Sequence, residues 1–284
     1  MAVTTVLLLS CPDQPGIVAA VSDFVYRHGG NILDAQQHTD RTDGVFFQRI
    51  EFEFDGCDLG RAEIEPAMGG LIERFGMDCA VRFSDDIARV GVMVSRESHC
   101  LVDLLARSRR GELVVEIPVV ISNHDDQAEV ASWFGVDFRH LPVTPDTSAD
   151  QERAVQQALD EHGVTLVVLA RYMQILSPEF CARWPGRIIN IHHSFLPAFS
   201  GGRPYHQAHE RGVKLVGVTA HYATAELDDG PIIDQDVVRV SHRDSVEDLR
   251  RRGRDLEVVV LARAVRAHVE HRVLVHGRRT VVFD

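Results

Sequence analysis

Hydrophobic and polar positions alternate in two different ways along the chain, and the pattern changes near residue 85. In the first part, β-rich runs are separated by runs with a helical apolar period. These runs predict strands at residues 3–9, 31–39, 45–54 and 77–83, and helices at residues 17–28 and 61–75. Gly29 and Gly30 follow the first helix, as glycines that end helices commonly do. The predicted element order is βαββαβ.

From Arg89 onward, predicted strands alternate with predicted helices. The strands cover residues 90–94, 117–121, 138–141, 166–170, 188–192 and 215–221, and the helices cover residues 101–107, 127–134 and 149–162. This alternation predicts a mainly parallel sheet covered by helices, a Rossmann-like α/β arrangement. Ser84-Asp85-Asp86 is the expected hinge, so we expect one domain at residues 1–84 and another at residues 88–284.

Polar side chains stand where several of these predicted strands end. Asn190 and His192 lie two residues apart, so they point to the same face of their strand. Asn123 and Arg171 follow two other strands. Because ligands bind outside the carboxyl ends of parallel strands, we expect these residues to converge.

Asn190, His192 and Asp228 form a candidate set for chemistry at a carbonyl carbon. An amide can donate a hydrogen bond to a developing oxyanion, and an imidazole can transfer a proton near neutral pH. Asp228 lies in a predicted loop at residues 226–230 and supplies a carboxylate, whereas the adjacent Asp229 is expected to be a turn residue. Turn-forming residues, Ser200-Gly201-Gly202, follow His192. Such a set requires no Ser or Cys nucleophile.

Composition narrows the class of protein. The 284 residues are 45% hydrophobic and 25% charged, which is typical of a folded globular protein. A net charge of -12 argues against nucleic acid as a partner. The five scattered cysteines predict free thiols and a cytoplasmic protein. No segment approaches membrane-spanning length, so we expect no membrane association.

The first part resembles an ACT domain, a ferredoxin-like regulatory module. The resemblance rests on Asp13-Gln14-Pro15-Gly16-Ile17-Val18 and on Gly29-Gly30-Asn31-Ile32, and covers about residues 1–84. It implies a possible amino-acid effector, with glycine and methionine as candidates, although these glycines could equally serve only turns and helix caps. An exposed sheet edge of this type, with a large acidic surface, predicts a homodimer or homotetramer.

The second part resembles the folate-dependent formyltransferases. The matching segments are residues 190–197 (Asn-Ile-His-His-Ser-Phe-Leu-Pro) and residues 221–233, which contain Leu227-Asp228-Asp229-Gly230. The resemblance implies that Asn190, His192 and Asp228 are catalytic. It also implies that the backbone of residues 169–176 holds the pteridine ring. The substrate-binding residues that it implies are Met173, Gln174, Ile175, Leu176, His221, Ala223 and Thr224.

Within that family, the chain is most similar to the members that hydrolyse 10-formyltetrahydrofolate. The ACT-like part precedes the transferase-like part, and His193 stands where transferases usually have proline. Residues 203–208, 253–257 and 260–265 also resemble those of the hydrolysing members. Transformylases that act on a phosphorylated amine place a glycine-rich loop after the first strand of this domain. Residues 94–100 here contain no glycine and include Glu97. Water is therefore the expected acceptor.

The predicted reaction releases formate and tetrahydrofolate, supplying formate for purine biosynthesis and balancing one-carbon folate pools. Asn190 and a protonated His192 would stabilise the oxyanion, and Asp228 would deprotonate water directly or through His192. We expect no cofactor beyond the folate substrate and no metal.

Three other interpretations remain open. The first is formyl transfer to an amine acceptor. The second is a zinc amidohydrolase, since five histidines crowd one region: His192, His193, His206, His209 and His221. The third is an amino-acid sensor built on an inactive transferase fold.

Overall fold

The computed structural model describes residues 2–198 and 204–284, which form two compact units. Residues up to 87, residues 270–274 and residues 281–284 make the first unit. Residues 88–269 and 275–280 make the second. The segment after residue 269 thus alternates between the two units, whereas the sequence analysis placed all of it in the second domain. The domain ranges 1–84 and 88–284 stay a prediction.

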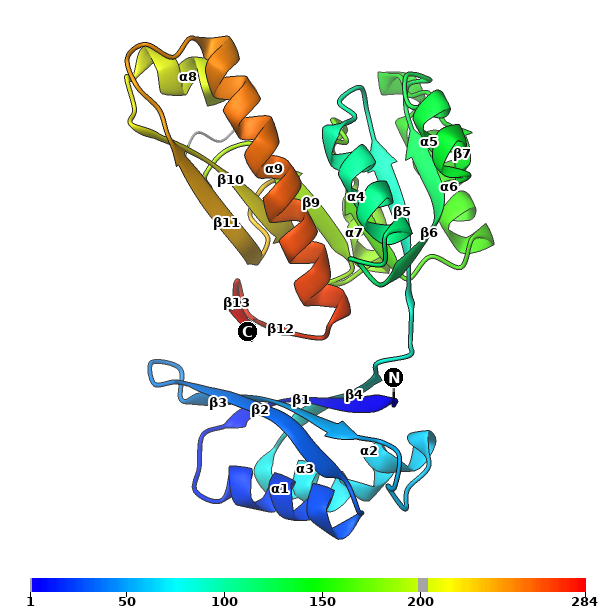
Figure 1. Cartoon of the computed structure of the whole chain (residues 1–284), viewed down its shortest axis with the longest axis vertical. Coiled ribbons are helices and arrows are strands. Elements are labelled where there is room, and N and C mark those ends of the chain that lie inside the picture. The colour runs from blue at the N-terminus through cyan, green and yellow to red at the C-terminus, as the bar shows by residue number, and fades with distance from the viewer. Residues whose placement is uncertain (1, 199–203) are drawn as a thin grey trace. The chain divides into compact units, whose positions relative to one another are not determined.

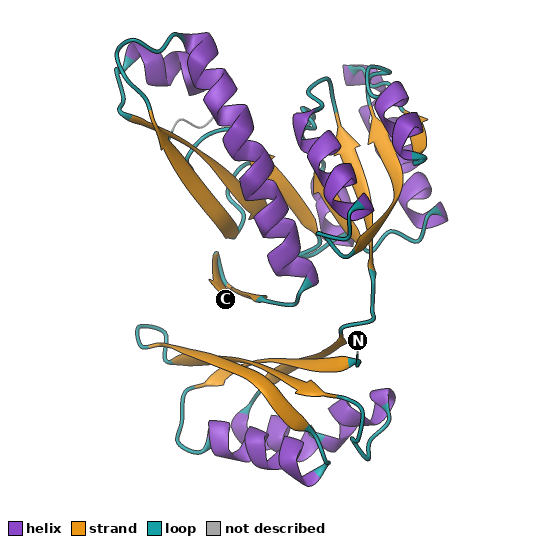
Figure 2. Cartoon of the chain, in the orientation of Figure 1, coloured by secondary structure: helices purple, strands orange, loops and turns teal. Residues whose placement is uncertain are grey.

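The first unit is a four-stranded antiparallel sheet in the order β2-β3-β1-β4, with its helices on one face (Figures 1 and 2). This arrangement confirms the predicted βαββαβ order. Leu7, Leu9 and Ile50 point from the sheet toward Val21 and Val25 of the first helix, and all five are buried. The elements are β1 (Thr4–Pro12), α1 (Ile17–Arg27), β2 (Asn31–Asp40), β3 (Val45–Glu53), the 3-10 turn η1 (Arg61–Glu63), α2 (Ile64–Ala67), α3 (Gly69–Phe75) and β4 (Asp78–Phe83).

The prediction of a single helix at residues 61–75 is wrong. The segment is instead divided into η1, α2 and α3, with Met68 at the junction between the two helices. Two consecutive glycines, Gly69 and Gly70, follow this junction, and each glycine weakens a helix interior by about 1 kcal/mol relative to alanine. Apolar periodicity predicted the buried face of the segment but not this interruption.

The other face of the same sheet is covered by the end of the chain. Phe283 packs with Val6, Leu8 and Phe47 in a second buried cluster of this unit. Arg49 is also buried there, and a buried guanidinium requires compensating partners. Its partners are the carboxylates of Asp34 and Glu51 and the carbonyl groups of Glu270 and His271.

The shifted pKa of His271 should make the stability of the folded protein depend on pH. Burial and the charges of Arg82 and Arg49 lower its pKa from 6.5 to about 4, although Asp86 opposes the shift. Between these values the unfolded chain binds a proton that the folded chain does not, so stability falls as the pH falls from about 6.5 to about 4. We expect His271→Asn, which tolerates the φ of 53° at this position, to reduce that loss. The thermal midpoints of the wild type and of His271→Asn are compared at pH 7 and pH 5. An equal fall in both proteins would contradict the assignment of this pH dependence to His271.

The second unit contains a seven-stranded sheet in the order β11-β10-β9-β8-β5-β6-β7. The strands from β9 to β7 are parallel, and β10 and β11 are antiparallel additions at one edge. The mainly parallel sheet is therefore confirmed. The strands are β5 (Ala88–Val94), β6 (Val115–Ser122), β7 (Asp137–His140), β8 (Leu166–Leu169), β9 (Ile188–His192), β10 (Leu215–Tyr222) and β11 (Ile232–Arg239).

Helices cover this sheet, as Figures 1 and 2 show. The long helix α9 (Val246–Val269) packs against β9, β10 and β11 and against α4 and α8. A separate apolar cluster joins Met93 and Val167 of the sheet to Val155, Phe180 and Trp184. The remaining helices are α4 (His99–Arg109), α5 (Ala128–Phe134), η2 (Pro145–Thr147), α6 (Ser148–Glu161), α7 (Pro178–Arg183) and α8 (Pro204–Glu210).

The strands β12 (Val273–His276) and β13 (Arg279–Val282), which the sequence pattern did not predict, form a two-stranded sheet. The turn expected at residues 200–202 lies outside the described residues, as does Arg203 of the segment at residues 203–208. Among the described helices, none combines the length and apolar character that a membrane crossing requires.

Candidate active site

All ten residues predicted to act at the site line one pocket of about 290 Å³. Asn190, His192 and Asp228 lie around it with residues 173–176 and with His221, Ala223 and Thr224. The pocket is at the carboxyl ends of β8 and β9, where a parallel sheet is expected to bind ligands. The structure therefore brings together residues that are as far as 55 positions apart in the sequence, from Met173 to Asp228.

The Asn190 carboxamide is oriented by the neighbouring strand. Asn190 and His221 are directly opposite in the antiparallel pair β9–β10, so their side chains share a face. His221 Nδ1 lies 3.0 Å from the carbonyl oxygen of Tyr222, which can only accept, so Nδ1 carries a proton. Burial lowers the pKa of His221, so its ring is neutral and Nε2 accepts a hydrogen bond from Asn190 Nδ2 at 3.1 Å. The second N–H of that amide has no partner among the described residues.

His192 is paired with Asp228. Nδ1 of His192 lies 3.2 Å from Oδ1 of Asp228, and this hydrogen bond lowers the pKa of the Asp228 carboxyl group. Asp228 is therefore ionised near neutral pH and holds the Nδ1 proton of the imidazole. Nε2 of His192 is buried and has no hydrogen-bond partner in the described chain. A buried imidazole with one nitrogen fixed by a carboxylate and the other unused is suited to proton transfer.

The loop that carries Asp228 has a constrained backbone. Asp228 has a φ of 56°, in the left-handed region that Asp tolerates better than most residues. Two residues later, Gly230 passes so close to β10 that an added Cβ would overlap the carbonyl oxygen of Tyr222. The N–H of Tyr222 donates to the carbonyl of Pro231 at 2.9 Å, which fixes the same loop to the strand.

We expect Gly230→Ala to displace the Asp228 loop. The Cβ overlap involves backbone on both sides, so the loop must shift, and overpacking of this kind typically costs about 1–3 kcal/mol. Both the thermal midpoint and the turnover number should therefore fall. The matched control is Gly70→Ala, because no heavy atom lies within 4 Å of a Cβ built there. A Gly230→Ala protein with normal turnover would show that the loop position is unimportant.

The segment that begins at Arg171 forms the opposite wall of the pocket. Arg171 has a φ of 64°, which turns the chain away from β8 toward Met173. Ser95 fixes this turn, because its N–H donates to the Arg171 carbonyl at 3.2 Å and its hydroxyl accepts from the N–H of Met173 at 3.0 Å. The Ser95 hydroxyl donates to Asn123 at 2.7 Å. Asn123 thus supports this wall but does not itself line the pocket, contrary to the expected convergence.

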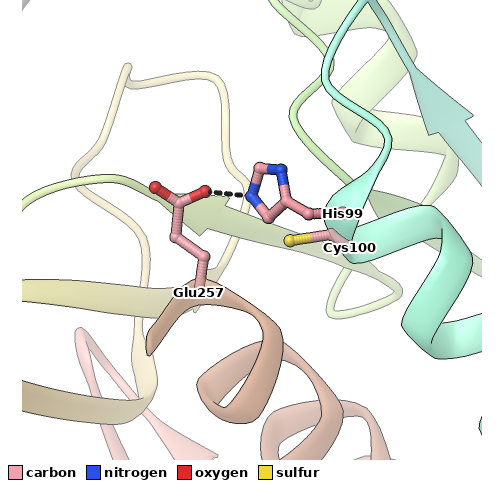
Figure 3. A group of neighbouring side chains, drawn as sticks. All are labelled: His99, Cys100 and Glu257. Carbon is pink, nitrogen blue, oxygen red and sulfur yellow. Dashed lines mark hydrogen bonds and ion pairs between the residues drawn. The ribbon is translucent and has the colours of Figure 1, made fainter. Parts of the chain in front are cut away.

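A second polar cluster lies around Glu257 of α9 (Figure 3). Its carboxylate accepts a hydrogen bond from His99 Nε2 at 2.7 Å, the contact drawn in Figure 3. It also accepts one from the Tyr205 hydroxyl at 3.1 Å and lies 3.6 Å from Arg171 Nε. Glu257 is 1% exposed. Burial would raise its pKa, but the His99 hydrogen bond and the Arg171 charge bring the pKa below its usual value. Glu257 is therefore a buried, ionised group that these three side chains hold in place.

The cluster around Glu257 also contains the side chains that could best hold a metal ion, as the zinc amidohydrolase interpretation requires. Within residues 2–198 and 204–284, His99, Cys100 and Glu257 form the only group of three side chains whose metal-binding atoms converge. Burial and the Glu257 charge raise the pKa of the Cys100 thiol, whereas a metal ligand must be a thiolate. The nearby Arg171 guanidinium also disfavours a cation. Of the histidines first considered, His206 and His209 do not line the pocket. The donor set therefore fits an ion-paired cluster better than a zinc site.

Residues 88–265 match the Formyl transferase family, and residues 5–69 match the ACT domain family. A formyltetrahydrofolate deformylase from Synechocystis sp. is 55% identical over 280 residues, which are 99% of this chain and 98% of that protein. This chain belongs to the formyltetrahydrofolate deformylase family.

Solved structures agree with this membership. The formyltetrahydrofolate deformylase from Pseudomonas syringae pv. tomato is 49% identical, has a TM-score of 0.97 and covers 100% of this chain and 95% of its own. Glycinamide ribonucleotide transformylase 1 from Symbiobacterium toebii is 38% identical with a TM-score of 0.67, covering 71% of this chain and 97% of its own. The full two-unit organisation is thus shared with the deformylase, whereas the similarity to the transformylase covers only part of the chain.

Sequence reasoning did not predict two features of the site. His193 lines the pocket beside His192, although strict alternation would have placed it on the other face. Glu257 is buried although it is charged. One available indication was that Glu257 shares a helical face with Gly253, Leu261 and Ala264, on an otherwise apolar stripe.

Proposed function

We propose that this chain hydrolyses 10-formyltetrahydrofolate to formate and tetrahydrofolate. The observation that carries the proposal is the full-length relationship to formyltetrahydrofolate deformylases, in a chain that places Asn190, His192 and Asp228 around one pocket. The pteridine ring would lie against residues 173–176, and His221, Ala223 and Thr224 would also contact the substrate. Exposed apolar side chains at this wall, Met173, Ile175 and Leu227, are available to pack on it.

The reaction requires one proton acceptor and one oxyanion site. Water attacks the formyl carbon, and His192 Nε2 takes a proton from it while Asp228 stabilises the resulting imidazolium through Nδ1. The oxyanion receives hydrogen bonds from the free N–H of Asn190 and from the newly protonated Nε2. Such donors typically contribute about 3–4 kcal/mol each to transition-state stabilisation. The C–N10 bond then breaks, N10 takes the proton from His192, and formic acid leaves and loses its remaining proton to solvent to become formate.

The segment after β5 supports water rather than a phosphorylated amine as the acceptor. Residues 94–100 contain no glycine. Glu97 of this segment forms an ion pair with Arg254 at 3.2 Å and lies 3.9 Å from His99. A carboxylate at this position repels a phosphate, which backbone N–H groups and cations would attract.

Several broader properties belong to the same proposal. The enzyme would need no cofactor and no resident metal, because Asp228, His192 and Asn190 supply the required groups. All five cysteines are free, which suits a reducing cytoplasm. An amino-acid effector would bind the ACT unit, where residues of the predicted motif, Asp13, Gln14 and Gly16 among them, line a cavity of about 450 Å³. A homodimer or homotetramer is the proposed assembly.

The direct test is an incubation with 10-formyltetrahydrofolate alone and with glycinamide ribonucleotide added. Equal release of formate and tetrahydrofolate without the amine supports hydrolysis. Turnover only with the amine would make the protein a transferase. Loss of turnover with a chelator and recovery with zinc would support the amidohydrolase interpretation instead. Binding of glycine or methionine without any folate turnover would support a sensor.

A further inference from the structure

His193 lies between the two polar clusters of the second unit. Its ring centroid is 5.2 Å from that of His192, with an angle of 35° between the planes, and 6.1 Å from that of Tyr205. β9 ends at His192, so the alternation of side chains no longer applies at the next residue. Two consecutive histidines can therefore line the same pocket.

The ring nitrogens of His193 are not used by the described part of the chain. Neither nitrogen forms a hydrogen bond or ion pair with any described residue, and the side chain is half-buried. The ring lines the 290 Å³ pocket and also a separate cavity of about 30 Å³, next to Tyr205 and Ser194. The catalytic residues Asn190, His192 and Asp228 line the larger pocket and not this cavity, so a water that attacks the substrate must occupy the larger pocket. The ring is half-buried and lines the pocket, so a water molecule in the pocket can bind its nitrogens.

The surroundings also determine the charge of His193. Burial, the positive charge of Arg171 and, once it is protonated, that of His192 lower its pKa to about 4, and the carboxylates of Glu257 and Asp228 only partly offset this. The imidazole is therefore neutral at physiological pH. A neutral imidazole has one N–H donor and one nitrogen that accepts a hydrogen bond.

We propose that His193 is a further catalytic residue that holds the attacking water, accepting a hydrogen bond from one O–H while the other O–H faces His192. This role rests on the proposed hydrolytic function. The proton that leaves the water goes to His192, the water oxygen bonds to the formyl carbon, and His193 keeps its own proton throughout. His193 thus favours water as the acceptor of the formyl group. A larger nucleophile could not form the same hydrogen bond to His193.

Two substitutions and a competing nucleophile test this role. We expect His193→Ala to lower kcat for formate release by about 10- to 100-fold while the KM for 10-formyltetrahydrofolate changes less than 3-fold. His193→Gln keeps an acceptor oxygen and should retain more activity than His193→Ala. His209→Ala, an exposed histidine on α8 outside the pocket, should match the wild type.

Hydroxylamine separates water positioning from general damage. It attacks the same formyl carbon and yields formohydroxamate and tetrahydrofolate, so the ratio of formohydroxamate to formate does not depend on the fraction of folded protein. We expect this ratio, corrected for the reaction without enzyme, to rise at least 5-fold in His193→Ala. A ratio equal to that of the wild type, or a kcat within 3-fold of it, would overturn the role of His193. Absence of formate release by the wild type itself would overturn the proposed function, and this role with it.

Discussion

Asp228→Asn should lower turnover by about 10³- to 10⁴-fold while tetrahydrofolate still binds within 3-fold of normal. The Asp228 carboxylate accepts the Nδ1 proton of His192 at 3.2 Å, and this contact leaves Nε2 free to take a proton from water. An asparagine carries no charge to stabilise the imidazolium. Its NH₂ group can also donate to Nδ1, which forces the other tautomer, in which Nε2 already carries a proton. That tautomer cannot act as the base.

Asp229→Asn is the matched control for this prediction. Asp229 is the next residue in the same loop, but it pairs with Arg278 and does not line the pocket. We therefore expect near-normal turnover. The hydrogen bond from His192 lowers the pKa of Asp228, so the wild-type carboxyl group is already ionised near neutral pH. Raising the pH should therefore not restore turnover to the Asp228→Asn protein. Comparable losses in both variants would place the effect in the loop rather than in the Asp228 carboxylate.

His192→Ala is expected to have the second largest effect, a loss in kcat of about 10³-fold. The substitution removes the base and, once the base is protonated, an oxyanion donor; each is typically worth about 10²-fold or more. Asn190 keeps its orientation through His221, so part of the oxyanion site remains. The loss should therefore appear in kcat, with a KM close to that of the wild type.

His206→Ala is the control for His192. His206 lies on α8 and does not line the pocket, although the zinc interpretation counted it with His192. We expect it to have normal kcat and KM, measured as formate release over a range of substrate concentrations. If His206→Ala and His192→Ala lost activity equally, a shared metal would explain the result better than proton transfer by His192.

Local patterns in the sequence predicted most of the framework of the site. The strands and helices predicted after residue 88 are present with ends within two residues of those in the structure. The period of two in a strand correctly placed Asn190 and His192 on one face. Asp228 could not be placed in this way, because a loop has no period; its inclusion came from the resemblance to formyltransferases.

Tertiary packing decided what the sequence did not show. Glu257 is buried because His99, Tyr205 and Arg171 converge on it from three separate segments. No local pattern at Glu257 contains that information. His193 enters the pocket only because β9 ends one residue earlier. Phe283 covers the sheet of the first unit although it lies at the far end of the sequence, so its burial depends on a contact over more than 200 residues.

The most direct test of water as the nucleophile is turnover of 10-formyltetrahydrofolate in water enriched in oxygen-18, without any amine. Mass spectrometry of the formate then reports the origin of its second oxygen atom. We predict one labelled oxygen per formate at the enrichment of the solvent, together with one tetrahydrofolate. Formate without label, or no formate until an amine is added, would contradict hydrolysis at this site.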